Sequence, residues 1–343
     1  MQGQVFKIHS DFYYVCTNDA NVIECKLREV LKKQKQKVLV GDYVEVDEAC
    51  AIYSVLGRKN SINRPSVANV DLAVIVSSLL EPKLDFVQLN RYLTYLKYHN
   101  IPALLCFNKE DLVENPVFSP LAQKILNTYQ PLGYKILFTS AKEKMGLDDF
   151  KNEIQGKTIV LCGLSGVGKS SLINALNPDF NLKVGKVSSY TGRGTHTTRH
   201  SEILNFGYFR VIDTPGFSNL KFDFILPKDL TPLFEDISKF ALDCRYSDCL
   251  HIKEDEHSLE CNVIRNLDKI DPDRYKSYVS FLSEAKEYKE KVTYQGTKEE
   301  DFKKHTHGEN KAKISVRKRQ SARNTQKQKM KNLHELIEEE NEY

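Results

Sequence analysis

The chain has 343 residues, and 41% of them are hydrophobic, which predicts two to three domains with real cores. No signal peptide is evident, so we expect a reducing cytoplasm, no disulfides and no association with a membrane. The net charge of +4 is unevenly distributed, because residues 302–331 hold eleven Lys or Arg and one Glu, a net charge of +10. The remainder of the chain therefore sums to −6, and the overall charge conceals a strongly basic segment.

Residues 1–62 alternate short strand-like runs with turns, which predicts a small β-barrel of the oligonucleotide-binding (OB) type that binds RNA. The runs are 4–8, 12–16, 38–46 and 51–55. Between them lies a basic segment that we expect to be a loop, with Lys26, Arg28, Lys32, Lys33, Lys35 and Lys37. A basic loop on such a barrel is typical of a surface that follows a phosphate backbone, and a solvated loop is the alternative.

The run 71–80 begins a second, parallel sheet, and residues 86–98 have helical spacing. The apolar run 101–107 then predicts a buried strand that ends at Asn108, followed by Lys109, Glu110 and Asp111. The carboxylate of Asp111 is able to accept from both N1–H and the N2 amine of guanine, whereas adenine would leave it buried and unpaired. We expect Lys109 to lie along the face of the base and Asn108 to brace the loop.

A second loop of the same kind follows the apolar run 135–138 about thirty residues later. It contains Ser140, Ala141 and Lys142, which we assign to GTP binding. The small side chain of Ala141 would let a backbone N–H approach the guanine O6.

A phosphate-binding loop comes next, between the strand-like run 158–162 and a helix that begins near Ser171. We expect its N–H groups and the helix N-terminus to hold the phosphates, with Lys169 reaching the β- and γ-phosphates and Ser170 ligating Mg²⁺. The residues assigned to GTP binding here are Gly163, Leu164, Ser165, Gly166, Val167, Gly168, Lys169, Ser170 and Ser171.

The order of these loops is the most informative feature of the chain, because in an ordinary GTPase the phosphate loop precedes the base-reading strand. Here the base-reading residues 108–111 come first. The predicted fold class is therefore α/β, with a circularly permuted P-loop GTPase domain. A permuted domain ends at its own nucleotide-sensing loop, so the segment that follows is connected to the γ-phosphate.

Two further segments predict the nucleotide-sensing switches. Asp213 follows a strand-like run and fits the Mg²⁺ carboxylate, and the N–H of Gly216 fits the γ-phosphate sensor. The next residue is Phe217, which cannot orient water as a Gln does, so the catalytic group must come from elsewhere. The loop 192–200 supplies His196 as the candidate, and either Thr197 or Thr198 closes over Mg²⁺, Thr198 being our assignment.

Together these features resemble the circularly permuted, ribosome small-subunit-dependent GTPases of the RsgA family over about residues 1–290. The resemblance rests on the inverted motif order, the run 213–217, the Gly-rich loop with His196, and a flanking domain on each side. It implies a role in late maturation of the small ribosomal subunit, turnover stimulated by that subunit, and a part for His196 in hydrolysis. It also implies that a hydrophobic residue after Gly216 is normal and that the N-terminal barrel is of the OB type.

Five cysteines and histidines between residues 244 and 261 predict one structural, tetrahedral zinc site, held by four of them. The family pattern is Cys-x₄-Cys-x-His-x₅-Cys, and Cys244, Cys249 and His251 match its first three ligands. The fourth position holds His257, and the next cysteine is Cys261. We favour Cys261, because the residues after it resemble those after the family cysteine, and we keep His257 as the alternative.

These predictions divide the chain into an OB-fold domain (1–62), the permuted GTPase domain (63–222), a helical zinc-binding domain (223–290) and a basic, disordered tail (291–343). The tail lies outside the resemblance; its composition favours an RNA-binding arm, and a solvated tail is the alternative.

We therefore predict a monomeric cytoplasmic GTPase that binds GTP and GDP with Mg²⁺, carries one zinc ion, and binds the small ribosomal subunit and its rRNA. Its nucleotide state would time its release from the subunit. The alternative is an rRNA-binding module for which GTP is mainly a regulatory or stabilising ligand.

Overall fold

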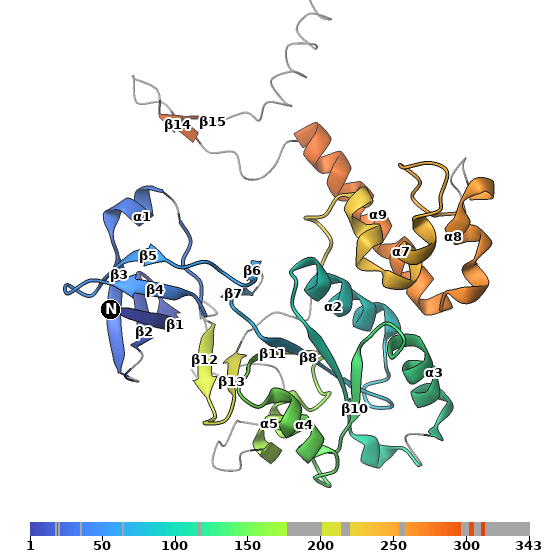
Figure 1. Ribbon diagram of the computed structural model, residues 1–343, viewed down its shortest axis with the longest axis horizontal. Coiled ribbons are helices and arrows are strands. Elements are labelled where there is room, and N and C mark those ends of the chain that lie inside the picture. Colours follow the sequence, from blue (N-terminus) through green and yellow to red (C-terminus); the bar gives the residue numbers. More distant parts are fainter. Residues whose placement is uncertain are drawn as a thin grey trace, which may run out of the picture. The chain divides into compact units, whose positions relative to one another are not determined.

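The computed structural model describes residues 1–17, 19, 21–34, 36–63, 65–114, 118–176, 201–213, 220–253, 258–295, 302–304 and 310–312. It divides into two compact units. The first comprises Met1–Leu220 with Pro232–Tyr278, and the second comprises Lys221–Thr231 with Val279–Tyr343. The first unit contains the predicted barrel, the predicted GTPase sheet and the cysteine cluster, so it holds nearly every residue that the sequence singles out (Figure 1).

The N-terminal part of the first unit is a closed five-stranded barrel, as predicted. Its strands are β1 (Gln2–His9), β2 (Phe12–Thr17), β3 (Val22–Leu27), β4 (Tyr43–Val46) and β5 (Ala51–Val55), in the order β1-β2-β3-β5-β4. Pairing of β1 with β4 closes the barrel, and β3 runs parallel to β5. Alternate residues point inward and form the core, including Val5, Val15, Cys25, Val44 and Ile52, each at most 1% exposed.

The basic segment of the barrel differs from the expected loop. It begins within strand β3 and continues as a short helix, α1 (Glu29–Lys33), with Leu31 packed in the barrel core. Its charges are partly neutralised by neighbouring acids: Arg28 forms an ion pair with Asp47 at 2.8 Å, and Lys32 forms one with Glu29 at 3.0 Å. Strand β3 escapes detection from sequence because charged residues alternate with its apolar ones.

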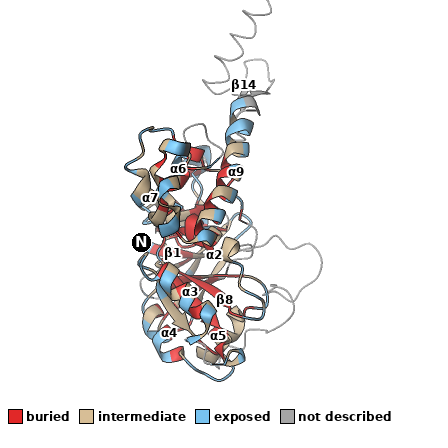
Figure 2. Ribbon diagram, turned by 90° about the vertical axis from the view of Figure 1, so that its right-hand side faces the viewer, coloured by how far each residue is buried: buried red, intermediate tan, exposed pale blue. Residues whose placement is uncertain are grey.

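The second half of the first unit is a mainly parallel sheet. Its strands are β8 (Leu72–Ser78), β9 (Ala103–Asn108), β10 (Lys135–Phe138), β11 (Thr158–Cys162), β12 (Glu202–Asn205) and β13 (Arg210–Asp213), in the order β10-β9-β8-β11-β13-β12. All neighbours are parallel except β12, which runs antiparallel to β13. Parallel strands buried on both faces explain the continuous apolar runs in the sequence, and Figure 2 shows β8 coloured as buried.

Four helices connect these strands. They are α2 (Phe86–Tyr98), α3 (Pro120–Tyr129), α4 (Leu147–Ile154) and α5 (Lys169–Leu176). Side-chain oxygens of Asp85 and Ser119 cap α2 and α3. Helices α4 and α5 bury Phe150 and Leu172 in one cluster with alternate residues of β8, and the buried face of α2 lies outside that cluster.

The first unit also includes residues that follow the sheet. These form α7 (Glu235–Ala241), α8 (Asn262–Arg265) and the beginning of α9 (Pro272–Gln295), with short 3₁₀ turns at Ser258–Glu260 and Leu267–Lys269. A further 3₁₀ turn, Glu110–Leu112, lies in the base-reading loop, and the short strands β6 (Ser61–Asn63) and β7 (Ser66–Ala68) link the barrel to the sheet.

The second unit contains α6 (Pro227–Leu230), a 3₁₀ turn that begins at Thr231, the later part of α9, and strands β14 (Phe302–Lys304) and β15 (Asn310–Ala312). Phe222 is fully buried there, with its ring centroid 4.7 Å from that of Phe281. A buried side chain of this size contributes about 1.5–3 kcal/mol relative to exposure. The tail composition did not predict the β14–β15 pair, and the rest of the tail lies outside the described residues.

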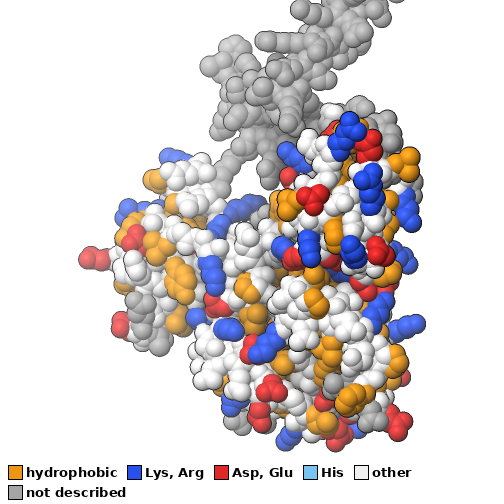
Figure 3. Space-filling model, turned by 45° about the vertical axis from the view of Figure 1, so that its right-hand side comes forward, with side chains coloured by type: hydrophobic (Ala, Val, Ile, Leu, Met, Phe, Trp, Pro, Cys, Tyr) orange, Lys and Arg blue, Asp and Glu red, His pale blue; other side chains and the backbone are white. Residues whose placement is uncertain are grey.

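On the face drawn in Figure 3, positive and negative side chains are interspersed and form no single field of one sign. Among the described residues, no helix is long and apolar enough to cross a membrane.

Candidate functional site

The predicted base-reading and phosphate loops meet at one buried side chain. Asn108, at the end of β9 and 2% exposed, donates from Nδ2 to the carbonyl oxygen of Val167 at 3.0 Å. Its Oδ1 accepts from the N–H of Ala141 at 3.0 Å and from the hydroxyl of Thr139 at 3.4 Å. One amide therefore joins three loops that are separated in sequence, which is the bracing role that we predicted for it.

Glycine is required where this junction is tight. Gly168 has φ of +94°, and a Cβ there would overlap the Asn108 amide. Gly163 has φ of +140°, and a Cβ there would overlap the carbonyl oxygen of Val76. Both positions therefore exclude a side chain by backbone conformation and by space. The approach of the two loops depends on Gly168, and the approach of the phosphate loop to β8 depends on Gly163.

The side chains assigned to guanine lie around Asp111. Ser140, fully buried, donates to Asp111 Oδ1 at 2.5 Å and accepts from the N–H of Glu143 at 3.0 Å. This arrangement orients the carboxylate, as a guanine reader requires. Lys109 is in the left-handed region with φ of +65°, and its Nζ donates to the carbonyl oxygen of Glu81 at 2.8 Å.

Ala141 differs in detail from its predicted use, because its N–H donates to Asn108, so a contact with the guanine O6 stays a prediction. Lys142, whose side chain is 77% exposed, pairs with Glu143 at 3.1 Å.

The phosphate loop connects β11 to α5, as predicted. Lys169, the first residue of α5, donates from Nζ to the carbonyl oxygens of Gly163 and Leu164, both at 2.8 Å. Burial lowers the pKa of this ammonium group from its ordinary value. Bound phosphate would oppose that effect, because an anion favours the charged form. Ser170 follows directly on the same first turn, and its role as a ligand of Mg²⁺ stays a prediction.

Part of the predicted site lies outside the described residues. His196, Thr197, Thr198 and Gly216 are in this group, and so are Phe217, His257 and Lys35. Asp213 is the last residue of β13, and its side chain is outside the description. The assignments of these residues to hydrolysis, to Mg²⁺ and to the γ-phosphate therefore stay predictions.

A second candidate site is a compact group of thiols and one imidazole. Cys244, Cys249, His251 and Cys261 place one ligand atom each within 4.8 Å of one another. Cys244 Sγ lies 3.8 Å from Cys261 Sγ, and His251 Nδ1 lies 3.6 Å and 3.5 Å from these two sulfurs. Tetrahedral zinc with Zn–S of about 2.3 Å and Zn–N of about 2.05 Å would give separations of about 3.8 and 3.6 Å. The four residues therefore have the spacing of a closed metal site and could hold one zinc ion.

The surroundings of this cluster suit a structural metal. His251 is 5% exposed, and its backbone is in the left-handed region with φ of +57°. The hydroxyl of Tyr275 donates to the His251 carbonyl oxygen at 3.0 Å, and that of Tyr278 donates to the Leu250 carbonyl oxygen at 2.9 Å. Burial raises the pKa of the Cys261 thiol to about 12, so a thiolate there requires a cation beside it.

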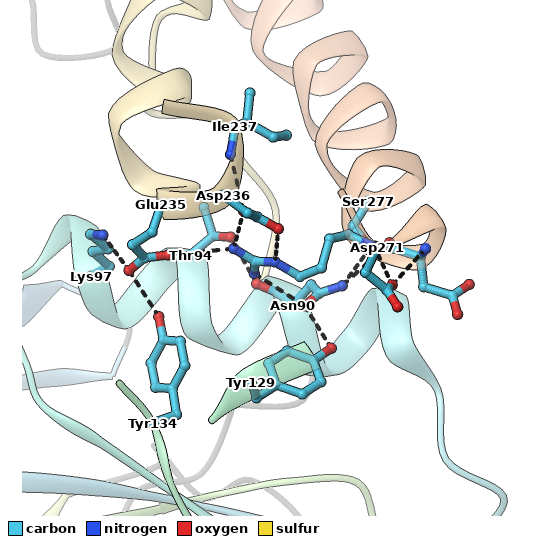
Figure 4. A network of polar contacts seen from close by, with 12 residues as sticks. Asn90, Thr94, Lys97, Tyr129, Tyr134, Glu235, Asp236, Ile237, Asp271 and Ser277 are labelled. Atoms are coloured by element: carbon cyan, nitrogen blue, oxygen red, sulfur yellow. Dashed lines mark hydrogen bonds and ion pairs between the residues drawn. The ribbon is translucent and has the colours of Figure 1, made fainter. Parts of the chain in front are cut away.

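A buried polar network joins α7 and the beginning of α9 to α2 and α3 (Figure 4). Arg274, 1% exposed, donates from Nε and Nη2 to Asp236 at 3.0 and 2.9 Å, and from Nη1 to Asn90 Oδ1 at 3.3 Å. Asn90 Oδ1 also accepts from the hydroxyl of Tyr129 at 2.9 Å. Burial opposes the Arg274 charge, but the bonds to Asp236 outweigh it, and the pKa of Arg274 is raised.

The sequence analysis missed this network, because Arg274 and Asn90 are 184 residues apart and neither belongs to a recognisable motif.

The base-reading strand β9 precedes the phosphate-loop strand β11 along the chain, yet their loops meet as in a nucleotide site, which defines a circularly permuted GTPase. The sequence matches the family described as RsgA GTPase over residues 55–223 and RsgA N-terminal domain over residues 2–50. It also matches the family described as 50S ribosome-binding GTPase over residues 158–338. The chain belongs to the RsgA family of GTPases.

Individual relatives agree with this assignment. The small ribosomal subunit biogenesis GTPase RsgA of Bacillus cereus (strain ATCC 10987 / NRS 248) is 38% identical over 292 residues, which are 84% of this chain and 98% of the relative. The protein of the same name from Bacillus subtilis (strain 168) is 36% identical over 295 residues, 84% of this chain and 98% of the relative.

Two solved structures have the same fold. The crystal structure of YjeQ from Thermotoga maritima matches with a TM-score of 0.70 and 33% identity, over 83% of this chain and 98% of that one. YloQ, described as a circularly permuted GTPase, matches with a TM-score of 0.67 and 33% identity, over 83% of this chain and 95% of that one.

Proposed function

We propose that this GTPase binds the small ribosomal subunit, acts in its late maturation in the cytoplasm, and uses GTP hydrolysis to time its release. The observation that carries the proposal is the Asn108 junction between the base-reading and phosphate loops, in a chain whose relatives are named small ribosomal subunit biogenesis GTPases. The junction supports a guanine nucleotide as the ligand, and the relatives support the subunit as the partner.

The described residues suit the binding steps. Asp111, held by Ser140, would accept from the guanine N1–H and N2 amine, and Lys109 would lie along the base. Lys169 would exchange its two loop carbonyls for the β- and γ-phosphates. Ser170 and Asp213 would hold Mg²⁺, with Thr198 completing its ligands, and the ion would neutralise charge that develops on the phosphates.

Hydrolysis needs a group that positions or deprotonates water, and Phe217 is unable to serve. We propose His196 for this role, supported by its place in the loop 192–200 and by the resemblance to the family. The subunit would stimulate turnover by placing this histidine beside the γ-phosphate.

We propose that subunit binding uses rRNA contacts from the barrel and the basic tail, with the chain acting as a monomer. The barrel type supports this for residues 1–62, and the net charge of +10 supports it for residues 302–331. The C-terminal segment would hold one structural zinc through Cys244, Cys249, His251 and Cys261, which the cluster spacing supports.

The test is co-sedimentation of the full-length protein with separated small and large ribosomal subunits, in the presence of either a non-hydrolysable GTP analogue or GDP. We expect binding to the small subunit that is tighter with the analogue, and weak binding to the large subunit. Asp111→Asn, which impairs guanine recognition, should remove the nucleotide dependence in the same assay. Equal binding to both subunits, or binding indifferent to nucleotide, would instead support an RNA-binding module for which GTP is a stabilising ligand.

A further inference from the structure

Strand β1 of the barrel also belongs to the GTPase sheet. It pairs antiparallel with β12, with Lys7 opposite Glu202, so barrel and sheet form one hydrogen-bonded array (Figure 1). A β-bulge between Val5 and Lys7 lies next to this point. Bulges bend a strand and redirect its side chains. The bulge thus allows one strand to close the barrel and to reach the neighbouring domain.

Side chains reinforce the junction at two places. Lys7 Nζ forms an ion pair with Glu202 Oε2 at 3.0 Å. Three residues earlier, Gln4 accepts on Oε1 from Arg210 Nη1 at 2.7 Å and donates from Nε2 to the carbonyl oxygen of Gly41 at 3.1 Å. Gln4 is 7% exposed and Arg210 is partly buried, so this bridge between the barrel and β13 is partly shielded from water.

The two contacted strands carry the ends of both predicted switches. Glu202 begins β12, two residues after the loop 192–200 ends. Arg210 begins β13, which ends at Asp213. In the hairpin formed by these strands, Glu202 lies directly opposite Asp213. Lys7, Glu202 and Asp213 therefore occupy one row across three adjacent strands, about 5 Å apart per step.

We infer that this row couples the barrel to the nucleotide, with Lys7 and Gln4 as positioning residues for the β12–β13 hairpin. A γ-phosphate and Mg²⁺ at Asp213 would fix that end of the hairpin, and β1 would be held with it. The coupling is reciprocal, so a partner that binds the barrel stabilises the arrangement of the switches that the γ-phosphate and Mg²⁺ favour. This inference rests on the proposed function for the assignment of Asp213 to Mg²⁺ and for the identity of that partner.

The energetics decide which contacts matter. The side chains of Lys7 and Glu202 are 41% and 35% exposed, and an ion pair at such a site contributes little on its own. The backbone pairing and the partly shielded Gln4–Arg210 bond therefore carry the coupling, and the ion pair favours their register. Two like charges directly opposite each other are destabilising, so reversing the charge of Lys7 or of Glu202 should weaken the pairing of β1 with β12.

The experiment measures amide hydrogen exchange of the full-length protein with Mg²⁺ and either a non-hydrolysable GTP analogue or GDP, without ribosomes. Exchange in residues 2–9 of the wild type should be about fivefold slower with the analogue, the lower end of allosteric coupling. Lys7→Glu and Glu202→Lys should each remove most of this difference, and the double variant should restore it. Glu48→Lys, a charge reversal at an exposed position elsewhere on the barrel, should keep it. Arg210→Met should also remove it, and Arg210→Lys, which keeps a donor for Gln4, should retain part of it.

Exchange in residues 2–9 that is the same with both nucleotides in the wild type would overturn the inference. So would single charge reversals that keep the full difference while the proteins remain folded by circular dichroism. Since no ribosome is present, a failure here is separate from a failure of subunit binding, which would overturn the proposed function and leave the coupling intact.

Discussion

Asn108 donates to the carbonyl oxygen of Val167 across 59 residues of sequence, at 3.0 Å. The bond ties the base-reading loop to the phosphate loop although their order along the chain is inverted. Circular permutation has therefore changed the connections of the sheet without changing the neighbours of the nucleotide site. Because the bond is buried, loss of the Asn108 amide would leave the Val167 carbonyl oxygen unsatisfied as well.

Guanine recognition is tested by Asp111→Asn. The amide would accept one bond where the carboxylate accepts two, so GTP affinity should fall by about 10²-fold or more, as expected for lost bonds to a charged group. Preference should shift toward xanthine nucleotides, because the amide is able to donate to the xanthine O2. Titration with fluorescent GTP and XTP measures both. Glu114→Gln, a matched loss of one carboxylate from an exposed neighbour, should leave both affinities unchanged; wild-type GTP affinity in Asp111→Asn would refute the assignment.

The catalytic assignment is tested by His196→Ala. GTP binding should persist, because the side chain is not assigned to the ground-state complex. Turnover in the presence of small subunits should fall by about 10²-fold or more, the usual scale for a positioned acid–base group. His200→Ala, from the same loop, is the control. If the His196 variant is stimulated as strongly as the wild type, another group activates the water.

The metal is tested by elemental analysis, with one zinc per chain as the expected result. Cys261→Ser should release zinc to a mild chelator, and His257→Ala should not, since Cys261 lies within the cluster. Cys50→Ser removes an exposed cysteine outside the cluster and is the control. Zinc loss should unfold the segment around residues 244–261 while the GTPase sheet keeps its nucleotide affinity. Tight zinc retention in Cys261→Ser would transfer the fourth ligand to another residue.

The buried network predicts a large cost for Arg274→Met. Removing the guanidinium leaves Asp236 without its buried counter-charge, while Glu235 keeps its ion pair with Lys97, so the free energy of unfolding should fall by about 3–5 kcal/mol. Arg245→Met is the matched control, because the Arg245–Glu260 ion pair is exposed and should contribute about 1 kcal/mol or less. Urea unfolding followed by far-UV circular dichroism compares them. If the two variants lose similar amounts of free energy of unfolding, the buried ion pairs of Arg274 contribute no more than an exposed pair, which contradicts the prediction.

The basic tail is tested by deleting residues 291–343. If the tail contacts phosphates, small-subunit binding should weaken and the plot of log affinity against log salt should become less steep, because fewer counterions are released. Intrinsic GTPase activity should not change, since the assigned nucleotide loops end before residue 217. Unchanged affinity with an unchanged salt slope would leave the tail without a role in RNA binding.

The sequence predicted the parts of the fold that depend on local pattern. The apolar runs before Asn108 and Gly163 identify β9 and β11, because parallel strands are buried on both faces. Strand β3 was missed, since Glu24 and Lys26 on its outer face interrupt its apolar residues. The cysteine cluster was predicted from its residue types and from the spacing that the family resemblance implies, which left His257 and Cys261 as alternatives, and the structure brings Cys261 to the cluster.

Long-range polar contacts were beyond such patterns. Gln4 and Arg210 are 206 residues apart, and Arg274 and Asn90 are 184 apart. Nothing in the local sequence distinguishes a buried arginine or glutamine from a solvated one, because burial is decided by elements that arrive from elsewhere in the chain.

The most direct test of the central claim is phosphate release from GTP, measured with the purified protein alone, with small ribosomal subunits and with large ones. We predict slow release by the protein alone, strong stimulation by small subunits, and none of this activity in Lys169→Ala, which loses the phosphate contact. Release by the wild type that small subunits do not accelerate, or that large subunits accelerate equally, would contradict the account.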